Sequence, residues 1–507
     1  MLGRAAGAVL VGVQARLVDV EVHLGGGLPN ISAVGLAHSS VREGIDRIRA
    51  ALAQSGFKLP QRRVTVNLAP ADVRKEGAAL DLPIASAILA ADGRLGSSPP
   101  RDIVLAGELA LDGAVRPVRG VLAIALAARS AGRTGLVVPS ANVAEARLVG
   151  GLCIWEAAHL ADAVALLRNP KLVPEAMSPA RTVETDDAAP AEDLADVRGQ
   201  ATARRALEVA AAGGHHILFS GPPGAGKTML ARRLAGIMPP LTHEEALEVT
   251  QIWSAAGMAT GLLRRRPFRA PHHGVSLAGL TGGGISLRPG EIALAHGGVL
   301  YLDELSEFRR DALESLRQPL ESGDVAVVRV HARAVFPARF LLAASMNPCP
   351  CGWHDDPRGR CRCTPNEVRR YASKLSGPLM DRIDLTVQVP AVDPADLTSS
   401  SIGESSEAVR HRVVVARERQ IARFAGSGAL TNARMTRADL EQHARLDEPA
   451  RRLLILACKR LAVTARGFDR IRRTSRTIAD LDASETIRER HVAEAVQYRP
   501  MPELHDR

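Results

Sequence analysis

The chain has 507 residues, of which 46% are apolar, and its formal net charge is +10. This apolar content excludes a disordered or fibrous protein, and the length predicts about three domains. Because no run of about 18 consecutive apolar residues occurs, the sequence predicts no membrane-spanning helix. The first residues resemble a signal peptide only faintly and continue into the alternating strand pattern of 17–23. We therefore expect a cytoplasmic protein.

Changes in composition divide the chain into four parts. Residues 1–168 are predicted to form an N-terminal domain, and 169–192 a linker, because this Pro- and Asp-containing stretch lacks hydrophobic periodicity. From 193 to 390, strand-like segments alternate with helix-like ones, which predicts an α/β core with a parallel sheet. Strand patterns fade after Pro390, so 391–507 is expected to be a helical lid domain.

A phosphate-binding loop opens the core. Eight residues fit the pattern G-x-x-x-x-G-K-[ST]: Gly221, Pro222, Pro223, Gly224, Ala225, Gly226, Lys227 and Thr228. An apolar strand pattern precedes them and helix-forming residues follow. Glycines let backbone N–H groups surround the phosphates of ATP, Lys227 reaches the outer phosphates and the Thr228 hydroxyl is expected to bind Mg²⁺. The alternative is a Gly-rich turn that binds no ligand, but such a turn does not require Lys-Thr after the last glycine.

A second apolar strand pattern ends in two carboxylates, Asp303 and Glu304. Asp303 is expected to complete the Mg²⁺ coordination, and Glu304 to orient and polarise the attacking water. A third strand pattern, 340–344, leads to Asn347, which is predicted to hold the same water. The alternative for Asn347 is that it only caps the turn before Pro348.

The segment 325–335 is predicted to form a hairpin. Arg329, His331 and Arg333 alternate along it, so they would project from one face of an extended segment and contact DNA phosphates without reading sequence. An ordinary solvated strand face is the alternative. A second basic region is 451–500, with 12 Lys and Arg against 6 Asp and Glu. This excess favours a nucleic acid, although an ordinary basic helical domain also fits.

Four cysteines follow the third strand pattern as C-x-C-x₉-C-x-C: Cys349, Cys351, Cys361 and Cys363. A polar insert, 349–363, carries them, and such a loop can gather four thiolates around a structural Zn²⁺. Four reduced thiols, or a disulfide in isolated protein, are the alternatives.

Several longer strings resemble one family. They are RPFRAPHH at 266–273, PGEIALAH at 289–296, MNPCPCG at 346–352 and SGPLMDRID at 376–384. These strings, with VNLAPAD at 66–72 and GELALDG at 107–113, are similar to the ComM (YifB) family of magnesium-chelatase-related AAA+ ATPases. The resemblance implies an AAA+ P-loop core with a helical lid and a homo-hexameric, ATP-driven DNA motor for branch migration in recombination and natural transformation.

The same resemblance implies two residues that act on a neighbouring subunit's nucleotide. Arg382 matches the arginine finger, whose alternative is a local ion pair with Asp381 or Asp384. Arg466 matches the lid contact called sensor 2, although several arginines follow it closely. The N-terminal domain resembles the α+β Lon protease fold, but Asp81 and Leu122 stand where the nucleophilic Ser and the Lys base belong. We expect no peptidase activity, because neither side chain can perform these roles.

Two other functions compete with the DNA motor. One is a magnesium-chelatase-like ATPase that drives metal insertion through protein partners, and the other is a protein-remodelling ATPase. The basic lid and the Lon-like domain favour the DNA motor.

Overall fold

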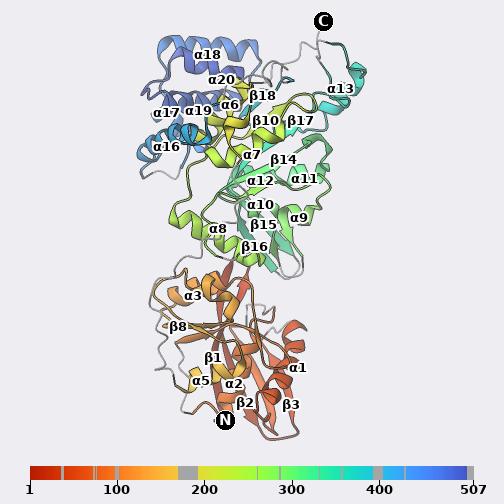
Figure 1. Cartoon of the computed structure of the whole chain (residues 1–507), viewed down its shortest axis with the longest axis vertical. Coiled ribbons are helices and arrows are strands. Elements are labelled where there is room, and N and C mark those ends of the chain that lie inside the picture. Colours follow the sequence, from red (N-terminus) through yellow and green to blue (C-terminus); the bar gives the residue numbers. More distant parts are fainter. Residues whose placement is uncertain are drawn as a thin grey trace.

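The computed structural model describes residues 1–35, 39–71, 75, 77–96, 102–169, 192–259, 261–284, 287–329, 332–354, 358–391, 403–426 and 430–499. Figure 1 shows three stacked parts, with the N-terminal part at one end, the P-loop core in the middle and the helical lid at the other end. The predicted linker lies outside the described residues apart from its two end positions, and the predicted domain boundaries stay predictions. Among the helices of the described ranges, none combines the length and the apolar composition needed to span a bilayer.

The N-terminal part is built on a seven-stranded mixed sheet in the order β3-β4-β2-β1-β5-β8-β9. The alternating pattern at 17–23 lies within β2, whose inward valines are fully buried. The strands are β1 (Leu2–Val11), β2 (Gln14–Gly25), β3 (Asn30–Val34), β4 (Arg63–Ala69), β5 (Ile103–Leu105), β8 (Gly135–Val138) and β9 (Cys153–Glu156), with a small β6 (Glu108–Leu109) and β7 (Val115–Arg116) pair. The helices are α1 (Ser39–Gln54), α2 (Asp81–Ala91), α3 (Val121–Ser130), α4 (Val143–Ala146) and α5 (Leu160–Arg168).

The core contains a five-stranded parallel sheet in the order β11-β14-β17-β10-β18. Its strands are β10 (Ile217–Ser220), β11 (Phe268–Arg269), β14 (Val299–Leu302), β17 (Leu341–Met346) and β18 (Leu385–Gln388). The sheet confirms the predicted parallel α/β core. Because β17 lies between β10 and β14, the carboxyl ends of these three strands meet at one edge, where α/β proteins bind their ligands.

Helices and short hairpins surround this sheet. The helices are α6 (Ala201–Gly213), α7 (Lys227–Ile237), α8 (His243–Ala256), α9 (Leu277–Thr281), α10 (Glu291–Leu294), α11 (Arg310–Ser315), α12 (Arg317–Ser322), α13 (Pro365–Ala372) and α14 (Gly377–Met380). The hairpins pair β12 (Gly282–Gly283) with β13 (Arg288–Pro289), and β15 (Asp324–Arg329) with β16 (Ala332–Pro337).

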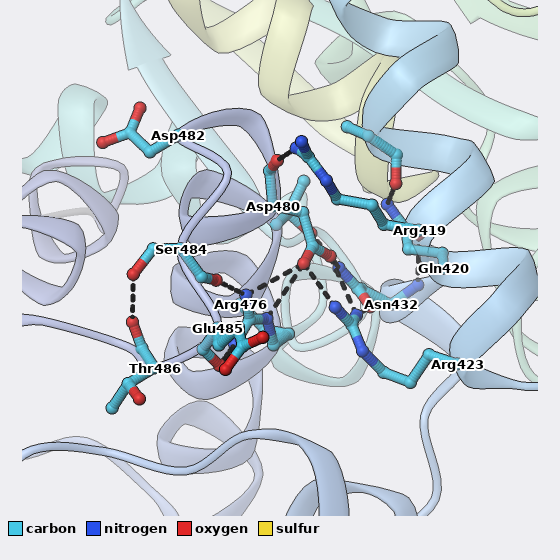
Figure 2. A network of polar contacts seen from close by, with 12 residues as sticks. Arg419, Gln420, Arg423, Asn432, Arg476, Asp480, Asp482, Ser484, Glu485 and Thr486 are labelled. Atoms are coloured by element: carbon cyan, nitrogen blue, oxygen red, sulfur yellow. Dashed lines mark hydrogen bonds and ion pairs between the residues drawn. The ribbon is translucent and has the colours of Figure 1, made fainter.

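The lid is helical, as predicted, and polar contacts inside it hold its helices together. Its helices are α16 (Ser406–Arg423), α17 (Arg437–His443), α18 (Glu448–Arg460), α19 (Ala465–Leu481) and α20 (Glu489–Gln497). Figure 2 shows that the carboxylate of Asp480 accepts hydrogen bonds from the guanidinium groups of Arg423 and Arg476. Asp480 and Arg476 are each 1% exposed, so each needs the other's charge in the interior. Part of the basic excess of 451–500 is therefore internal to the lid.

His216 directly precedes β10 and hydrogen-bonds to β17, and its titration makes the stability of the fold depend on pH. Its Nδ1 accepts the N–H of Leu342 at 3.0 Å, which requires an unprotonated Nδ1, and burial lowers the pKa of His216 to about 4. The unfolded chain binds a proton here below about pH 6.5, whereas the folded chain does so only near pH 4. The free energy of unfolding should therefore fall as the pH decreases from 6.5 to 4, by up to about 1.4 kcal/mol per pH unit.

Thermal unfolding at pH 7.5 and pH 5 measures this effect. We expect a lower midpoint at pH 5, and a smaller difference between the two pH values in His216→Gln, whose side chain does not titrate. An equal pH dependence in the variant would show that other groups are responsible.

Among the described residues, hydrogen bonds join the N-terminal part to the core at two places. At the first, Ser254 of α8 donates its hydroxyl to the buried carboxylate of Glu145, and its carbonyl accepts the N–H of Gly120 at 3.1 Å. At the second, the β1–β2 turn meets the core: Gln251 of α8 donates to the carbonyl of Val13 at 2.7 Å, and Val13 is buried in the cluster that contains the β15–β16 hairpin. The hairpin is therefore packed against both parts.

Candidate nucleotide-binding site

The phosphate-binding loop begins at the end of β10 and leads directly into α7. Gly224 and Gly226 have φ of +77° and +87°, a region that favours glycine, so these two glycines allow the loop to curl. The ammonium of Lys227 donates to the carbonyls of Gly221 at 2.5 Å and Pro222 at 2.9 Å, and to Oδ1 of Asn347 at 3.0 Å. Burial lowers the pKa of Lys227. The cation therefore lies at the centre of the loop, and Asn347 from β17 reaches it.

Asp303, at the end of β14, faces the first residues of α7. The Thr228 hydroxyl donates to Oδ2 of Asp303 at 3.0 Å and accepts a hydrogen bond from Tyr301 at 3.1 Å, while Ser345 donates to Oδ1. Burial acts to raise the pKa of Asp303, but the hydrogen bonds from Ser345, Tyr301 and Thr228 hold it below its ordinary value. The carboxylate stays ionised next to a hydroxyl, and this oxygen pair fits a Mg²⁺ ion.

Glu304 follows Asp303 in a strained backbone conformation, with φ of +52°. Its N–H donates to Oδ1 of Asp303 at 3.1 Å and to the Ser345 hydroxyl at 3.3 Å, so these bonds hold the unusual turn in place. The side chain of Glu304 is 56% exposed, with Oε2 3.8 Å from Nδ1 of His273. The carboxylate is thus open to solvent beside His273.

Arg382 and Arg466 both line a pocket of about 480 Å³ between the core and the lid. Residues from both parts line it, including Glu321, Asp381, Arg434 and Arg473, and none belongs to the phosphate-binding loop. Arg382 pairs with Glu321 at 2.6 Å, whereas Asp381 pairs with Arg470 at 3.1 Å. The local pair with Asp381 or Asp384 that the sequence left open for Arg382 is therefore replaced by a pair with Glu321.

Arg466 differs from the arginines that follow it in α19. Arg470 donates to the carbonyl of Ile383, Arg472 to that of Leu440, Arg473 to that of Met435, and Arg476 to Asp480. Arg466 is exposed and has no hydrogen-bond or ion-pair partner in the part of the chain that the structure describes. Among these five arginines, it is the one whose guanidinium is available to a ligand.

The four cysteine thiols of the insert form one cluster. Their sulfur atoms all lie within 4.8 Å of one another, with separations of 3.4 Å for Cys349–Cys351 and 3.8 Å for Cys349–Cys361. Four sulfurs bound tetrahedrally to zinc at about 2.3 Å are about 3.8 Å apart, so these thiols fit one ion. The cluster also adjoins the nucleotide loop: a Cβ added to Gly352 would lie 2.6 Å from Cδ of Pro223.

Metal content tests this fit. We expect about one zinc per chain in protein purified without chelator, because four thiolates close the coordination shell. The variant Cys361→Ser should lose most of this zinc, and Cys458→Ser, which alters a cysteine outside the cluster, should keep it. A zinc content near zero in the unaltered protein would exclude the site.

The DNA-contact candidates fall on the β15–β16 hairpin, whose two strands pair antiparallel. Arg329 pairs in register with Ala332, and Arg333 with Val328. Arg329 and Arg333 therefore do not share the single face that the alternation predicted, because the chain reverses between them. Arg333 is exposed beside Val328, which is 67% exposed. His331, the third candidate, lies outside the described residues.

Three family profiles together match most of the chain. Residues 193–397 match "Magnesium chelatase, subunit ChlI", 20–142 match "Subunit ChlI of Mg-chelatase", and 403–499 match "Magnesium chelatase, subunit ChlI C-terminal". The YifB protein of Salmonella typhimurium is 43% identical over 97% of this chain and 96% of its own length. Competence protein ComM of Haemophilus influenzae is also 43% identical, over the same shares of both chains.

The chain belongs to the ComM (YifB) family. The magnesium-chelatase 38 kDa subunit of Cereibacter sphaeroides is a more distant relative, 29% identical over 26% of this chain and 45% of that subunit. The full-length likeness is thus to ComM (YifB) proteins, and the likeness to this chelatase subunit covers a smaller part. Membership implies an AAA+ protein that uses ATP and Mg²⁺. The ammonium of Lys227 suits binding of phosphates, and the oxygens of Thr228 and Asp303 suit binding of Mg²⁺.

Three residues beside the nucleotide site were not predicted from the sequence to be site residues. Tyr301 and Ser345 support Asp303 and Thr228, and His273 lies beside Glu304. A signal for Tyr301 was present, because it stands two positions before Asp303 on one strand and so shares its face. His273 could be connected with Glu304 only through the fold.

Proposed function

We propose that the protein is an ATP-driven DNA motor whose nucleotide sites lie between subunits of a ring, as in a homo-hexamer. The proposal of a site shared between subunits is supported by one observation: within one chain, the phosphate-binding residues and the two candidate arginines lie in different places. Lys227, Asp303 and Glu304 gather at one edge of the sheet, whereas Arg382 and Arg466 line a different pocket. A second copy would bring its arginine pocket to this edge and complete the site.

ATP binding begins with the loop. Backbone N–H groups of 224–228 and the Lys227 ammonium bind the phosphates, while Thr228 and Asp303 would hold Mg²⁺. The ion supplies neutralisation of charge that develops between the outer phosphates. To reach the γ-phosphate, Lys227 exchanges its hydrogen bonds to the carbonyls of the loop for bonds to phosphate oxygens.

Hydrolysis requires an oriented water. Glu304 accepts a hydrogen bond from this water and takes its proton as the oxygen attacks the γ-phosphorus in line. The bond from the γ-phosphorus to the bridging oxygen breaks, so ADP leaves with that oxygen and phosphate is formed. Asn347 fixes the other side of the water, and its 3.0 Å contact with Lys227 keeps it next to the phosphates. Arg382 of the adjacent subunit then neutralises the phosphoryl oxygens, and Arg466 adds a second positive charge from the lid.

DNA is the polymer that we propose this ATPase moves, in the cytoplasm and during recombination or transformation. Support comes from the full-length likeness to a protein named for competence and from the net charge of +10. A chelatase-like role has weaker support, because the alignment with the magnesium-chelatase 38 kDa subunit covers only 26% of this chain. The structural zinc of the cysteine insert belongs to the same proposal.

The hairpin arginines are proposed DNA-backbone contacts. Replacing both Arg329 and Arg333 by Ala should weaken DNA binding and reduce the slope of log affinity against log salt by about two, because each phosphate contact releases roughly one counterion. Fluorescence anisotropy with a labelled oligonucleotide over a salt series measures this slope. Arg309→Ala, an exposed arginine outside the hairpin, is the control. An unchanged slope in the double variant would remove the hairpin from the proposal.

ATP turnover with and without DNA tests the function. We expect branched or single-stranded DNA to stimulate turnover, and Lys227→Ala to abolish it under both conditions. Turnover that responds to unfolded casein and not to DNA would instead support the protein-remodelling alternative.

A further inference from the structure

The guanidinium of Arg382 is held inside its own subunit. Its Nη2 lies 2.6 Å from Oε2 of Glu321, and its Nη1 donates to the carbonyl of Pro378 at 2.7 Å. The side chain of Arg382 is 15% exposed and that of Glu321 is 66% exposed. Nε of Arg382 is buried without a hydrogen-bond partner among the described residues. Arg382 is thus in a retracted position, and Glu321 is the carboxylate that holds it there.

Glu321 stands at the foot of the β15–β16 hairpin. It lies in the last turn of α12, and Ser322 and Gly323 connect this turn to the first residue of β15. The carbonyl of Gly323 accepts the N–H of Ala338 at 2.7 Å, which closes the foot of the hairpin. The lid also reaches this point, since a Cβ added to Gly323 would lie 3.2 Å from Nη1 of Arg434. Glu321 therefore holds the arginine and lies two positions before a glycine that adjoins both the hairpin and the lid.

The ion pair between Glu321 and Arg382 is suited to exchange. The Arg382 side chain is 15% exposed, but the carboxylate side chain that it pairs with is 66% exposed, so water and salt screen the pair and reduce its net contribution to stability. A nucleotide triphosphate offers a higher negative charge and several oxygens that match a guanidinium. Arg382 would exchange this pair and one backbone carbonyl, that of Pro378, for phosphate oxygens. Arg470 is more deeply buried and would lose two backbone carbonyls.

We infer that Glu321 is a positioning residue that keeps Arg382 retracted until the nucleotide of a neighbouring subunit takes the guanidinium. The inference rests on the proposed shared site and adds its regulation. When Arg382 moves, the last turn of α12 loses this ion pair with the 376–384 segment. Because this turn continues into β15, nucleotide binding at the interface is transmitted to the hairpin proposed to contact DNA.

The test uses Glu321→Gln, which keeps the size of the side chain and removes its charge. Glu314→Gln is the matched control, because Glu314 forms its ion pair with Arg317 at 2.7 Å and not with Arg382. Two quantities are measured on the full chain: the protein concentration at half-assembly with a slowly hydrolysed ATP analogue, by sedimentation velocity, and deuterium uptake in 324–329 and 332–337 with and without the analogue. Thermal unfolding checks that both variants are folded.

We expect Glu321→Gln to assemble at a concentration about two- to fivefold lower than the unaltered protein, the range for loss of one exposed ion pair. Its hairpin should take up deuterium without the analogue as the unaltered protein does with it, and Glu314→Gln should match the unaltered protein. Half-assembly at an unchanged concentration, or a hairpin that responds to the analogue as before, would overturn the inference.

The proposed function has a separate failure. If Arg382→Ala turns over ATP normally, the shared site is wrong, and the inference fails with it. If Arg382→Ala is inactive while Glu321→Gln assembles like the unaltered protein, only the role of Glu321 is wrong.

Discussion

Glu304→Gln is expected to bind ATP with unchanged affinity and to hydrolyse it at least about 100-fold more slowly, the usual contribution of a general base. The amide keeps the size of the side chain but cannot take a proton from water. Its contacts at the site are also kept, because the bonds that hold the turn come from the backbone N–H of Glu304. Nucleotide binding by a fluorescent ATP analogue and single-turnover hydrolysis measure the two steps separately.

Glu307→Gln is the matched control. Glu307 lies three positions further along the same turn, and its carboxylate pairs with Lys374 at 3.2 Å. This variant should hydrolyse ATP at the rate of the unaltered protein. If Glu304→Gln retains more than a tenth of that rate, another group removes the proton and the assignment of Glu304 is wrong.

Arg382→Ala should lower ATP turnover by about 10³-fold or more, because a guanidinium that neutralises the transferring phosphoryl group contributes this much in comparable systems. ATP binding should change much less, since Lys227 and the loop supply most contacts to the ground state. Arg317→Ala is the control, because Arg317 lies near Arg382 on the same surface but pairs with Glu314. It should leave turnover unchanged.

Mixing two inactive variants separates an arginine that acts between subunits from one that acts within a subunit. Lys227→Ala keeps Arg382 but lacks a working loop, and Arg382→Ala keeps the loop. In mixed rings, some interfaces combine an intact loop with an intact arginine, so part of the activity should return. No recovery at any mixing ratio, with mixed rings shown to form, would place the action of Arg382 within its own chain.

The sequence predicted those parts of the site that depend on residues close together along the chain. The loop needs glycines at fixed positions before Lys227, so its pattern also fixed the end of β10 and the start of α7. Asp303 and Asn347 follow buried strands, and parallel strands bring such ends to one edge of the sheet. The confirmed parallel core and helical lid follow from the change between period-two and helical patterns.

Long-range contacts could not be predicted in the same way. Glu321 and Arg382 are separated by 61 positions, and no local pattern joins them. The alternation of Arg329 and Arg333 predicted one face because the turn between them was not placed, and a reversal of the chain changes which residues lie opposite each other. The basic excess of 451–500 also could not show which arginines are buried. Arg476 is charged, but it is internal and paired with Asp480.

ATP hydrolysis by this chain is proposed to drive movement along branched DNA. Separation of a labelled four-way junction and of a three-stranded branch, with ATP and over a salt series, tests it most directly. We expect ATP-dependent strand separation by the unaltered protein and none by Lys227→Ala. Absence of separation at every salt concentration, together with ATP turnover that no DNA alters, would contradict the account and favour a chelatase-like or protein-remodelling role.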